Sequence, residues 1–199
     1  MAISKFRLYG ASLAQLKTLC EELGLPRFAH KQIAKWLYSR FVSDIDSMTD
    51  LSKVAREILK EHCELGLSAP LKESVSQDGT KKYLFRTSRG EYIESALIPD
   101  GERMTLCVSS QAGCKMGCKF CATGRMGFRH HLTATEIINQ ILSIPERDKL
   151  TNLVFMGMGE PLDNIDNLLL TLDILTAEWG MAWSPTRITV STAGVARTL

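Results

Sequence analysis

Three cysteines lie close together in the segment CKMGCKFCATG, which spans residues 114–124. They are Cys114, Cys118 and Cys121, so their spacing is C-x3-C-x2-C. Cysteine binds metals as the thiolate, and a group of thiols in a reducing compartment indicates a metal site or catalysis. The spacing of this group therefore decides which metal it could hold.

Zinc, a disulfide and an iron–sulfur cluster are the candidates for this group. Zinc would need a fourth ligand, either Cys107 or one of His130 and His131. Neither the four-cysteine set nor the three-cysteine and one-histidine set has a familiar spacing. A disulfide between neighbours would leave an odd thiol. A 4Fe–4S cluster is normally held by four thiolates, and with three it keeps one open iron position. The amine and carboxylate of S-adenosylmethionine (SAM) can chelate that iron, and reductive cleavage of the sulfonium gives a carbon radical. Spacing favours the cluster, with zinc as the alternative.

A second candidate binding loop, MGMGEPL, follows the apolar run LVFM at residues 153–156. Gly159 lets the backbone approach a ligand closely, and Glu160 offers a carboxylate to a ligand ammonium. A GxGE sequence alone is weak evidence, since most such loops are ordinary tight turns. It gains weight because its strand is expected beside the strand that leads to the cysteines. Ser191 adds a hydroxyl at the end of a third expected strand.

The chain as a whole limits what this site can belong to. With 199 residues, 45% apolar and 23% charged, the sequence is typical of a globular protein with a sizeable core. No apolar run approaches the roughly 20 residues of a membrane span, and the first residues lack a signal peptide's apolar centre. We therefore expect a cytoplasmic protein without membrane contact, whose thiols stay reduced. Cys20 and Cys63 lie in helical patterns and are expected to be core residues.

Charge is spread unevenly, although the formal net charge is only +2. Between Arg103 and Thr135 there are five basic residues, two histidines and no acidic residue. This basic run surrounds the cysteines and would suit a polyanion, because Lys and Arg contacts to phosphate supply non-specific nucleic-acid affinity. Arg27, Lys31 and Lys35 are four residues apart and form a second basic stripe. Either feature could also be an ordinary solvated surface.

The elements that would position these residues fall into three segments. Residues 1–68 carry apolar residues at helical spacing after a capping box at Ser12 and Gln15, which predicts a helical N-terminal domain. Residues 69–102 change to short strands broken by Asp-Gly and Arg-Gly turns, which predicts a β-hairpin connector. Residues 103–199 alternate strands and helices, which predicts parallel strands joined by crossovers.

The predicted fold is α/β, with a small helical domain and a short antiparallel element before an incomplete (β/α) barrel. The strands expected in the barrel segment are 104–110, 153–156 and 187–191, and three strands cannot close a barrel. Loops at the C-terminal ends of such strands build active sites. The fold therefore brings the cysteine loop, the glycine-rich loop and Ser191 to one edge.

Four segments resemble motifs of a known family, the radical-SAM RNA methyltransferases RlmN and Cfr. They are IESALIP (93–99), CVSSQAGCKMGCKFCATG (107–124), GMGEPL (157–162) and ITVSTAGV (188–195), in that order. The cysteine spacing is shared by the whole radical-SAM superfamily, and the preceding CVSSQAGC narrows the resemblance to RlmN and Cfr. The resemblance covers the whole chain. We favour RlmN as the commoner, housekeeping member, and the expected barrel is then a radical-SAM barrel.

The resemblance implies a role for each candidate residue. The ligands of a 4Fe–4S cluster would be Cys114, Cys118 and Cys121, and the contacts to SAM would be Gly159, Glu160 and Ser191. Glu94 would accept a proton, and Cys107 would be the thiol that resolves a protein–RNA adduct. Without the resemblance both would be weak candidates, because a strand Glu usually faces solvent and a strand Cys is usually core.

The implied reaction uses two SAM molecules. One methylates a C-terminal cysteine of the enzyme, and the other generates a radical that abstracts hydrogen from this methyl group before the resulting methylene adds to adenine C2. The implied substrates are an adenosine of 23S rRNA and, for RlmN, an adenosine of the tRNA anticodon loop. Such an adenosine must be unstacked into the site. The implied protein partner is a reducing electron donor, flavodoxin-like in kind.

The chain departs from the family pattern after Cys121, because no further cysteine follows. The methyl-carrying thiol and the later half of the barrel are missing from this sequence. We expect these 199 residues to be the N-terminal part of a longer enzyme or a truncated product, able to bind a cluster but not to methylate RNA. The alternatives are a Cfr-type enzyme acting on adenine C8, a zinc-dependent RNA-binding module, and a structural fragment whose barrel edge a partner chain completes.

Overall fold

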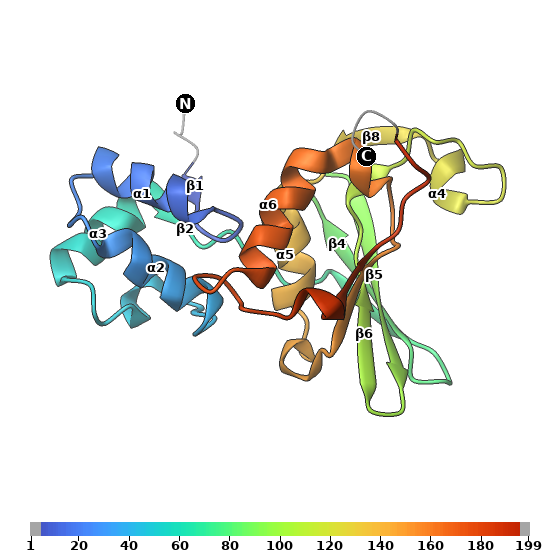
Figure 1. Ribbon diagram of the computed structural model, residues 1–199, viewed down its shortest axis with the longest axis horizontal. Coiled ribbons are helices and arrows are strands. Elements are labelled where there is room, and N and C mark those ends of the chain that lie inside the picture. Colours follow the sequence, from blue (N-terminus) through green and yellow to red (C-terminus); the bar gives the residue numbers. More distant parts are fainter. Residues whose placement is uncertain (1–4, 196–199) are drawn as a thin grey trace.

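The computed structural model describes residues 5–195, which form a helical unit and a larger unit built on a mixed sheet. Figure 1 shows the helical unit at one end of the long axis and the sheet at the other. The helical unit contains β1 (Phe6–Arg7), α1 (Leu13–Glu22), α2 (Ala29–Tyr38), the short helix η1 (Ile45–Ser47), α3 (Lys53–His62) and β2 (Cys63–Glu64). β1 and β2 pair in parallel, so the first and last elements of this unit close on each other.

Local sequence accounts for the start of α1, where the predicted capping box is present. Ser12 Oγ accepts the Gln15 amide at 3.1 Å, and the Gln15 side chain accepts the Ser12 amide at 2.8 Å. Cys20 and Cys63 are 2% exposed, and burial raises the pKa of each thiol to about 11. Both are core residues, as predicted.

The helical unit contacts the sheet unit through a few close approaches. The Tyr38 ring packs edge-on against Trp179 with centroids 5.7 Å apart. Thr135 Oγ1 donates to the Tyr9 carbonyl at 2.8 Å. Gly10 lies directly against Thr135, and its φ of +86° and a Cβ contact of 2.3 Å exclude any larger residue. These contacts fix the helical unit against the helices that cover the sheet.

The sheet has six strands in the order β10-β9-β6-β5-β4-β3. Neighbours from β3 to β6 are antiparallel, and β6, β9 and β10 are parallel, so the hairpin strands and the crossover strands form one continuous sheet. The predicted antiparallel element and parallel crossovers are both present. The strands are β3 (Lys72–Val75), β4 (Lys81–Arg86), β5 (Tyr92–Asp100), β6 (Arg103–Cys107), β9 (Asn152–Phe155) and β10 (Ile188–Val190).

The remaining elements lie between the parallel strands. They are β7 (Gln111–Gly113), α4 (Ala122–Arg125), β8 (Phe128–His131), α5 (Ala134–Leu142), η2 (Arg147–Lys149), η3 (Pro161–Asn164), α6 (Ile165–Thr176) and η4 (Pro185–Arg187). The expected strand over 104–110 is wrong in its extent, because β6 ends at Cys107 and the chain bends through buried Ser109 before β7 begins. Ser109 Oγ donates to the Glu94 carbonyl at 2.6 Å and accepts the Met158 amide at 2.9 Å, which holds this bend.

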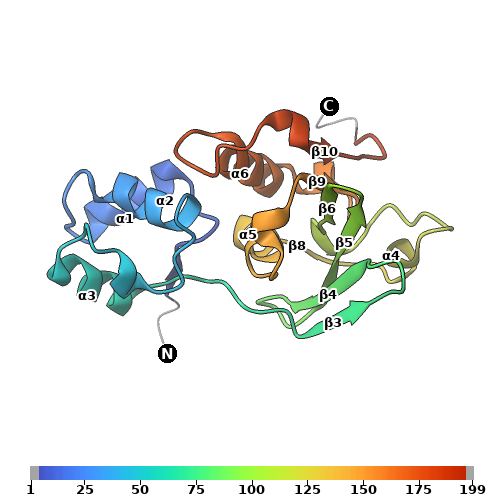
Figure 2. The ribbon, with the colours of Figure 1, turned by 90° about the horizontal axis from the view of Figure 1, so that it is seen from below.

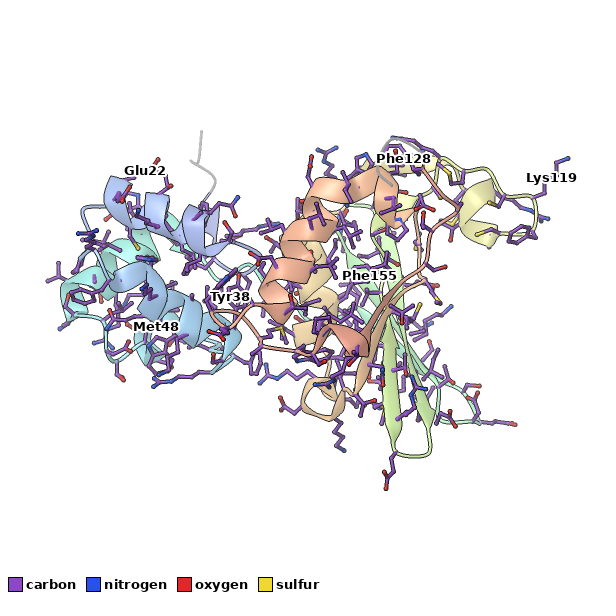
Figure 3. All side chains as sticks on the ribbon, in the orientation of Figure 1. Glu22, Tyr38, Met48, Lys119, Phe128 and Phe155 are labelled. Carbon is purple, nitrogen blue, oxygen red and sulfur yellow. The ribbon has the colours of Figure 1, made fainter. Side chains whose placement is uncertain are left out.

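The two faces of the sheet differ in what covers them. Helices α5 and α6 pack on one face (Figures 1 and 2), and side chains that point there, such as Leu106, Leu153 and Phe155, are at most 1% exposed. Phe155 and Tyr38, labelled in Figure 3, are at most 1% exposed and belong to the packed interior. A continuous apolar run such as LVFM is typical of a strand buried on both faces, but Met156, just beyond the end of β9, is 55% exposed. No helix within residues 5–195 is long and apolar enough to cross a membrane.

Candidate cluster and ligand site

The cysteine loop is a long excursion between the paired strands β7 and β8. Its neck is closed by the Cys114 amide, which donates to the Gly127 carbonyl at 3.2 Å. Gly113 permits this closure, since a Cβ there would lie 1.8 Å from that carbonyl oxygen. The cysteines therefore do not follow the first parallel strand directly. A separate two-stranded hairpin carries them.

The three thiols sit at successive points of this loop. Cys114 begins the loop. The carbonyl of Cys118 accepts a hydrogen bond from the Cys121 amide at 3.1 Å, which forms a turn, and Cys121 is the N-cap residue of α4. All three are half-buried and in no disulfide. Arg125 closes the far half of the loop, because its Nε and Nη2 donate to the Lys119 carbonyl at 3.0 and 2.8 Å.

The side chains of the loop decide which metal group it could hold. Within residues 5–195, no three or more His, Cys, Asp or Glu side chains are arranged so that they could hold one metal ion. The donor set nevertheless fits a thiolate-ligated group, because three free cysteines share one tightly folded loop. Gly124 supports this folding, since a Cβ there would lie 3.0 Å from the Cys118 backbone. The loop therefore supplies three thiolate donors and no fourth.

The glycine-rich loop after β9 lies directly against the bend that leads to the cysteines. The Ser110 and Gln111 amides both donate to the Met158 carbonyl, at 2.9 and 3.1 Å. Gly159 has a φ of +100°, and a Cβ there would lie 2.5 Å from Gln111 Cβ. The glycine is therefore required both by the backbone conformation and by the side chain packed over it.

Glu160 is 4% exposed, and its carboxylate is held by the chain itself. Oε1 accepts the Leu162 amide at 3.1 Å and the Thr192 hydroxyl at 2.5 Å, and Oε2 accepts the Ala193 amide at 2.8 Å. An ionised carboxylate offers about four acceptor positions, so these three contacts leave room for about one more donor. Thr192 and Ala193, in the segment after β10, thus orient the Glu160 carboxylate. Ser191, the residue before Thr192, is exposed.

Glu94 and Cys107 share the uncovered face of the sheet. Ala96 pairs with Cys107 across β5 and β6, and Glu94 lies two residues before Ala96, on the same side. Such diagonal neighbours have Cα atoms about 7–8 Å apart, within reach of long side chains. Glu94 forms an ion pair with Lys82 at 3.0 Å. Burial raises the pKa of the Cys107 thiol, against the opposing effect of the Met156 amide, so the thiol is protonated at neutral pH.

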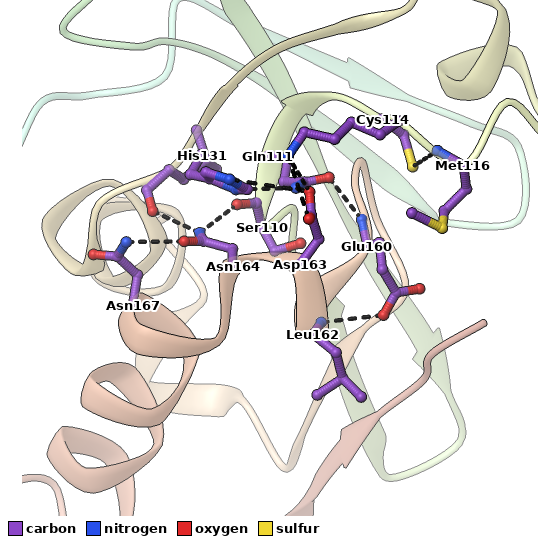
Figure 4. A network of polar contacts seen from close by, with 12 residues as sticks. Ser110, Gln111, Cys114, Met116, His131, Glu160, Leu162, Asp163, Asn164 and Asn167 are labelled. Carbon is purple, nitrogen blue, oxygen red and sulfur yellow. Dashed lines mark hydrogen bonds and ion pairs between the residues drawn. The ribbon is translucent and has the colours of Figure 1, made fainter. Parts of the chain in front are cut away.

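A polar network joins the cysteine loop to the glycine-rich loop, and no pattern in the sequence predicts it. Figure 4 shows Gln111 at its centre. Gln111 Nε2 donates to Asp163 Oδ2 at 2.8 Å and lies 3.0 Å from His131 Nδ1, while its Oε1 accepts the Glu160 amide at 2.9 Å. Lys115, next to Cys114, forms an ion pair with Asp163 at 2.9 Å. The only sequence signal was position, since Gln111 and Asp163 sit inside or beside the motifs.

Two pKa shifts accompany this network. Burial acts to raise the pKa of Asp163, but hydrogen bonds from Lys115 and Gln111 outweigh it and hold the pKa below its ordinary value. Burial lowers the pKa of His131, with Asp163 acting in the opposite direction. Asp163 is therefore ionised and His131 neutral at pH 7, which lets Nδ1 accept the second Gln111 proton.

The basic run around the cysteines is partly structural. Figure 3 shows Lys119 projecting from the tip of the loop. Lys115 and Arg125 are engaged by Asp163 and by the Lys119 carbonyl. Arg103 is not near the cysteines, because it starts β6 at the opposite end of that strand (Figure 1). Arg27, Lys31 and Lys35 are all exposed and form no ion pair within the described part of the chain.

Family models match both units of the chain. The model described as ribosomal RNA large subunit methyltransferase N-terminal domain matches residues 6–65, and that of the radical SAM superfamily matches residues 108–198. A probable dual-specificity RNA methyltransferase RlmN of Bacteroides thetaiotaomicron is 57% identical over 197 residues, or 99% of this chain. A protein of the same name from Phocaeicola vulgatus is 57% identical over 100% of this chain. The chain belongs to the RlmN family.

A solved structure agrees with this family assignment. A radical SAM methyltransferase from Sphaerobacter thermophilus matches with a TM-score of 0.85 and 41% identity over 96% of this chain. The chain spans 57% of the length of that protein and 57% of each of the two RlmN relatives. The family assignment and the incomplete radical-SAM barrel predicted from the motifs are both confirmed.

Proposed function

We propose that this RlmN-family chain is the cluster-binding and SAM-binding part of a methyltransferase that modifies C2 of an RNA adenosine. The observation that carries the proposal is a convergence at one edge of the sheet. The cysteine loop, the Gly159–Glu160 loop and the end of β10 all meet there, beyond the C-terminal ends of β6, β9 and β10. The uncovered face with Glu94 and Cys107 leads up to this edge.

Cys114, Cys118 and Cys121 would hold a 4Fe–4S cluster, and SAM bound to it would supply the radical chemistry. Three thiolates leave one position for the amine and carboxylate of SAM. Glu160 would accept a hydrogen bond from the SAM amino group at its remaining acceptor position, with Thr192 orienting its carboxylate. Gly159 would admit the ligand against the backbone, and exposed Ser191 would offer a hydroxyl from the neighbouring strand.

Glu94 and Cys107 would act on the RNA adduct from the uncovered face. The carboxylate of Glu94 is ion-paired to Lys82 and 44% exposed, so it can accept a proton from a ligand on that face. The Cys107 thiol is protonated, so it must lose its proton before it can attack. The cross-strand placement of these residues supports a shared site for them.

The proposed RNA substrates are 23S rRNA and tRNA, and exposed basic surface supports them. Residues 1–68 would contact RNA through Arg27, Lys31 and Lys35, beside a hollow of about 380 Å³ lined by Phe28 and His30. A second hollow of about 250 Å³ beside the neck of the cysteine loop is lined by Tyr92 and Arg129, which suit a base and a phosphate. The reductant would be a flavodoxin-like protein.

Mass spectrometry of nucleosides tests the activity at the level of the gene. Large-subunit rRNA and tRNA from cells that lack the gene should lose the C2-methyl adenosine that cells with the gene contain. Restoring the gene with Cys118→Ala should not bring the mark back, whereas an unaltered gene should. Loss of a C8-methyl instead would establish the Cfr-type alternative. Unchanged RNA together with zinc in the purified protein would establish the RNA-binding module.

A further inference from the structure

Lys115 ties the first cysteine of the loop to a distant element. It follows Cys114 directly, and its Nζ lies 2.9 Å from Asp163 Oδ2 and 3.3 Å from Oδ1. The same Nζ lies over the Phe128 ring, 4.4 Å from the centroid, which adds a cation–π contact. These two contacts tie the Lys115 side chain, and with it the residue after Cys114, to Asp163 and Phe128.

Gln111 ties the same carboxylate to the glycine-rich loop. Its side chain is fully buried and donates to Asp163 Oδ2 at 2.8 Å, while accepting the Glu160 amide at 2.9 Å. A buried amide that loses a partner carries a desolvation cost, so this bridge has one preferred geometry. Oδ2 of Asp163 is therefore contacted by Lys115 of the cysteine loop and by Gln111, whose side chain also holds the Glu160 amide of the glycine-rich loop.

The far half of the cysteine loop does not depend on this carboxylate. Arg125 closes it on the Lys119 carbonyl, and the Cys121 amide closes its turn on the Cys118 carbonyl. Loss of Asp163 should therefore loosen the segment around Cys114 and leave residues 118–125 in place. A change confined to the Cys114 end would therefore indicate a local role of Asp163, whereas a change in both halves of the loop would indicate general destabilisation.

We propose that Asp163 is a positioning residue: through Lys115 and Gln111 it holds the Cys114 end of the cysteine loop in register with the Gly159–Glu160 loop. The proposal rests on the proposed function for what the two loops bind. An isolated surface ion pair contributes little to stability. Asp163 matters for geometry instead, because a ligand that spans both loops requires them to hold a fixed separation.

Hydrogen exchange on the metal-free full chain tests the coupling without any cofactor. Asp163→Asn keeps an acceptor for Gln111 but removes the charge that holds Lys115, so amides near Lys115–Gly117 should exchange about threefold to tenfold faster. Asp163→Ala removes both contacts, so amides of residues 157–160 should also exchange faster. The matched control is Asp166→Asn, which removes an exposed acidic charge from the first turn of α6, directly after the short helix that carries Asp163, and should change neither segment.

The outcome that overturns the proposal is equally specific. Asp163→Asn that behaves like Asp166→Asn, or that speeds exchange evenly over residues 114–127, would rule out a selective tie to Cys114. A Lys115→Met variant should reproduce the effect, and combining it with Asp163→Asn should add nothing, because the two residues act through one contact. Full additivity of the two substitutions would also overturn it.

SAM binding after anaerobic cluster assembly provides the functional readout. At equal iron content, Asp163→Asn should raise the dissociation constant for SAM about threefold to tenfold and alter the electron paramagnetic resonance signal of the SAM-bound cluster. Asp166→Asn should leave both unchanged. Unchanged SAM affinity in Asp163→Asn would overturn the positioning role. Wild-type chain that takes up no iron would overturn the proposed function instead, and the exchange experiment would still decide the coupling.

Discussion

The two faces of the six-stranded sheet carry different kinds of side chain. The face under α5 and α6 carries apolar side chains that are almost fully buried, such as Leu106, Leu153 and Phe155. The opposite face carries half-exposed and polar side chains at the alternate positions, including Glu94 and Cys107. Because successive strand residues point to opposite faces, one stretch of sequence supplies the packed core on one face and, under the proposed function, the reacting side chains on the other. Stability and activity should therefore respond to different residues of the same strands.

Substitutions at the end of β9 should show the largest difference in stability between the two faces of the sheet. Phe155→Ala leaves a cavity under the helices and should lower the free energy of unfolding by about 3–5 kcal/mol. Met156→Ala, next to it on the uncovered face and 55% exposed, should change it by less than about 0.5 kcal/mol. Denaturant unfolding of both variants measures the difference. Equal losses would mean that both faces of β9 are packed.

Loss of a buried carboxylate on the covered side should have the next largest effect. Glu136 is 8% exposed and accepts the Ser88 amide at 2.8 Å, the Ser88 hydroxyl at 2.9 Å and the Thr133 amide at 2.9 Å. It joins the β4–β5 turn to the start of α5. Glu136→Gln should lower the free energy of unfolding by about 2 kcal/mol, since charged acceptors contribute about 1.5–3 kcal/mol per lost bond. The exposed control Glu178→Gln should leave it unchanged.

The same carboxylate predicts an acid dependence of stability. Burial acts to raise the pKa of Glu136, but hydrogen bonds from Thr133 and Ser88 outweigh it and hold the pKa below its ordinary value of 4.5. Its contribution is therefore full above pH 4.5 and is lost as the pH falls through the lower pKa of the folded state. Unfolding measured from pH 7 down to pH 3 should show a smaller loss in Glu136→Gln than in wild type. Parallel curves would contradict the assignment.

Substitution of Glu94 should have the smallest effect on stability. Its ion pair with Lys82 is 44–55% exposed, so Glu94→Gln should change the free energy of unfolding by less than about 0.5 kcal/mol. Under the proposed function the same substitution should abolish the RNA mark in the gene-replacement assay, because the proton acceptor is lost. A large loss of stability would show that Glu94 and its ion pair with Lys82 are needed to hold the fold together.

Periodicity explains how much of this architecture could be predicted. The capping boxes at Ser12 and Thr133, the parallel strands and the buried Cys20 and Cys63 all follow from local patterns. The β7–β8 hairpin does not, because strands of three and four residues beside glycines have no distinctive period. The apolar run LVFM could not show that one face of its strand lies open.

The two loops of the candidate site could be predicted from residue type and spacing. The cysteine loop and the GMGEPL loop stand out in the sequence and lie together in the structure. The Gln111–Asp163–Lys115 network could not be predicted, because its partners are about fifty residues apart and join only when the sheet is assembled. Glu160 stands out in the sequence by its place in the GMGEPL loop, but its hydrogen bond with Thr192 depends in the same way on two strands meeting.

We propose that Cys114, Cys118 and Cys121 hold an iron–sulfur cluster without a fourth cysteine ligand, and metal analysis tests this proposal most directly. The full chain, purified and reconstituted without oxygen, should be brown and contain about four irons and four sulfides per chain. Cys118→Ala should lose most of this iron, while the buried control Cys20→Ala should keep it. A colourless protein that contains about one zinc and no sulfide would contradict the account.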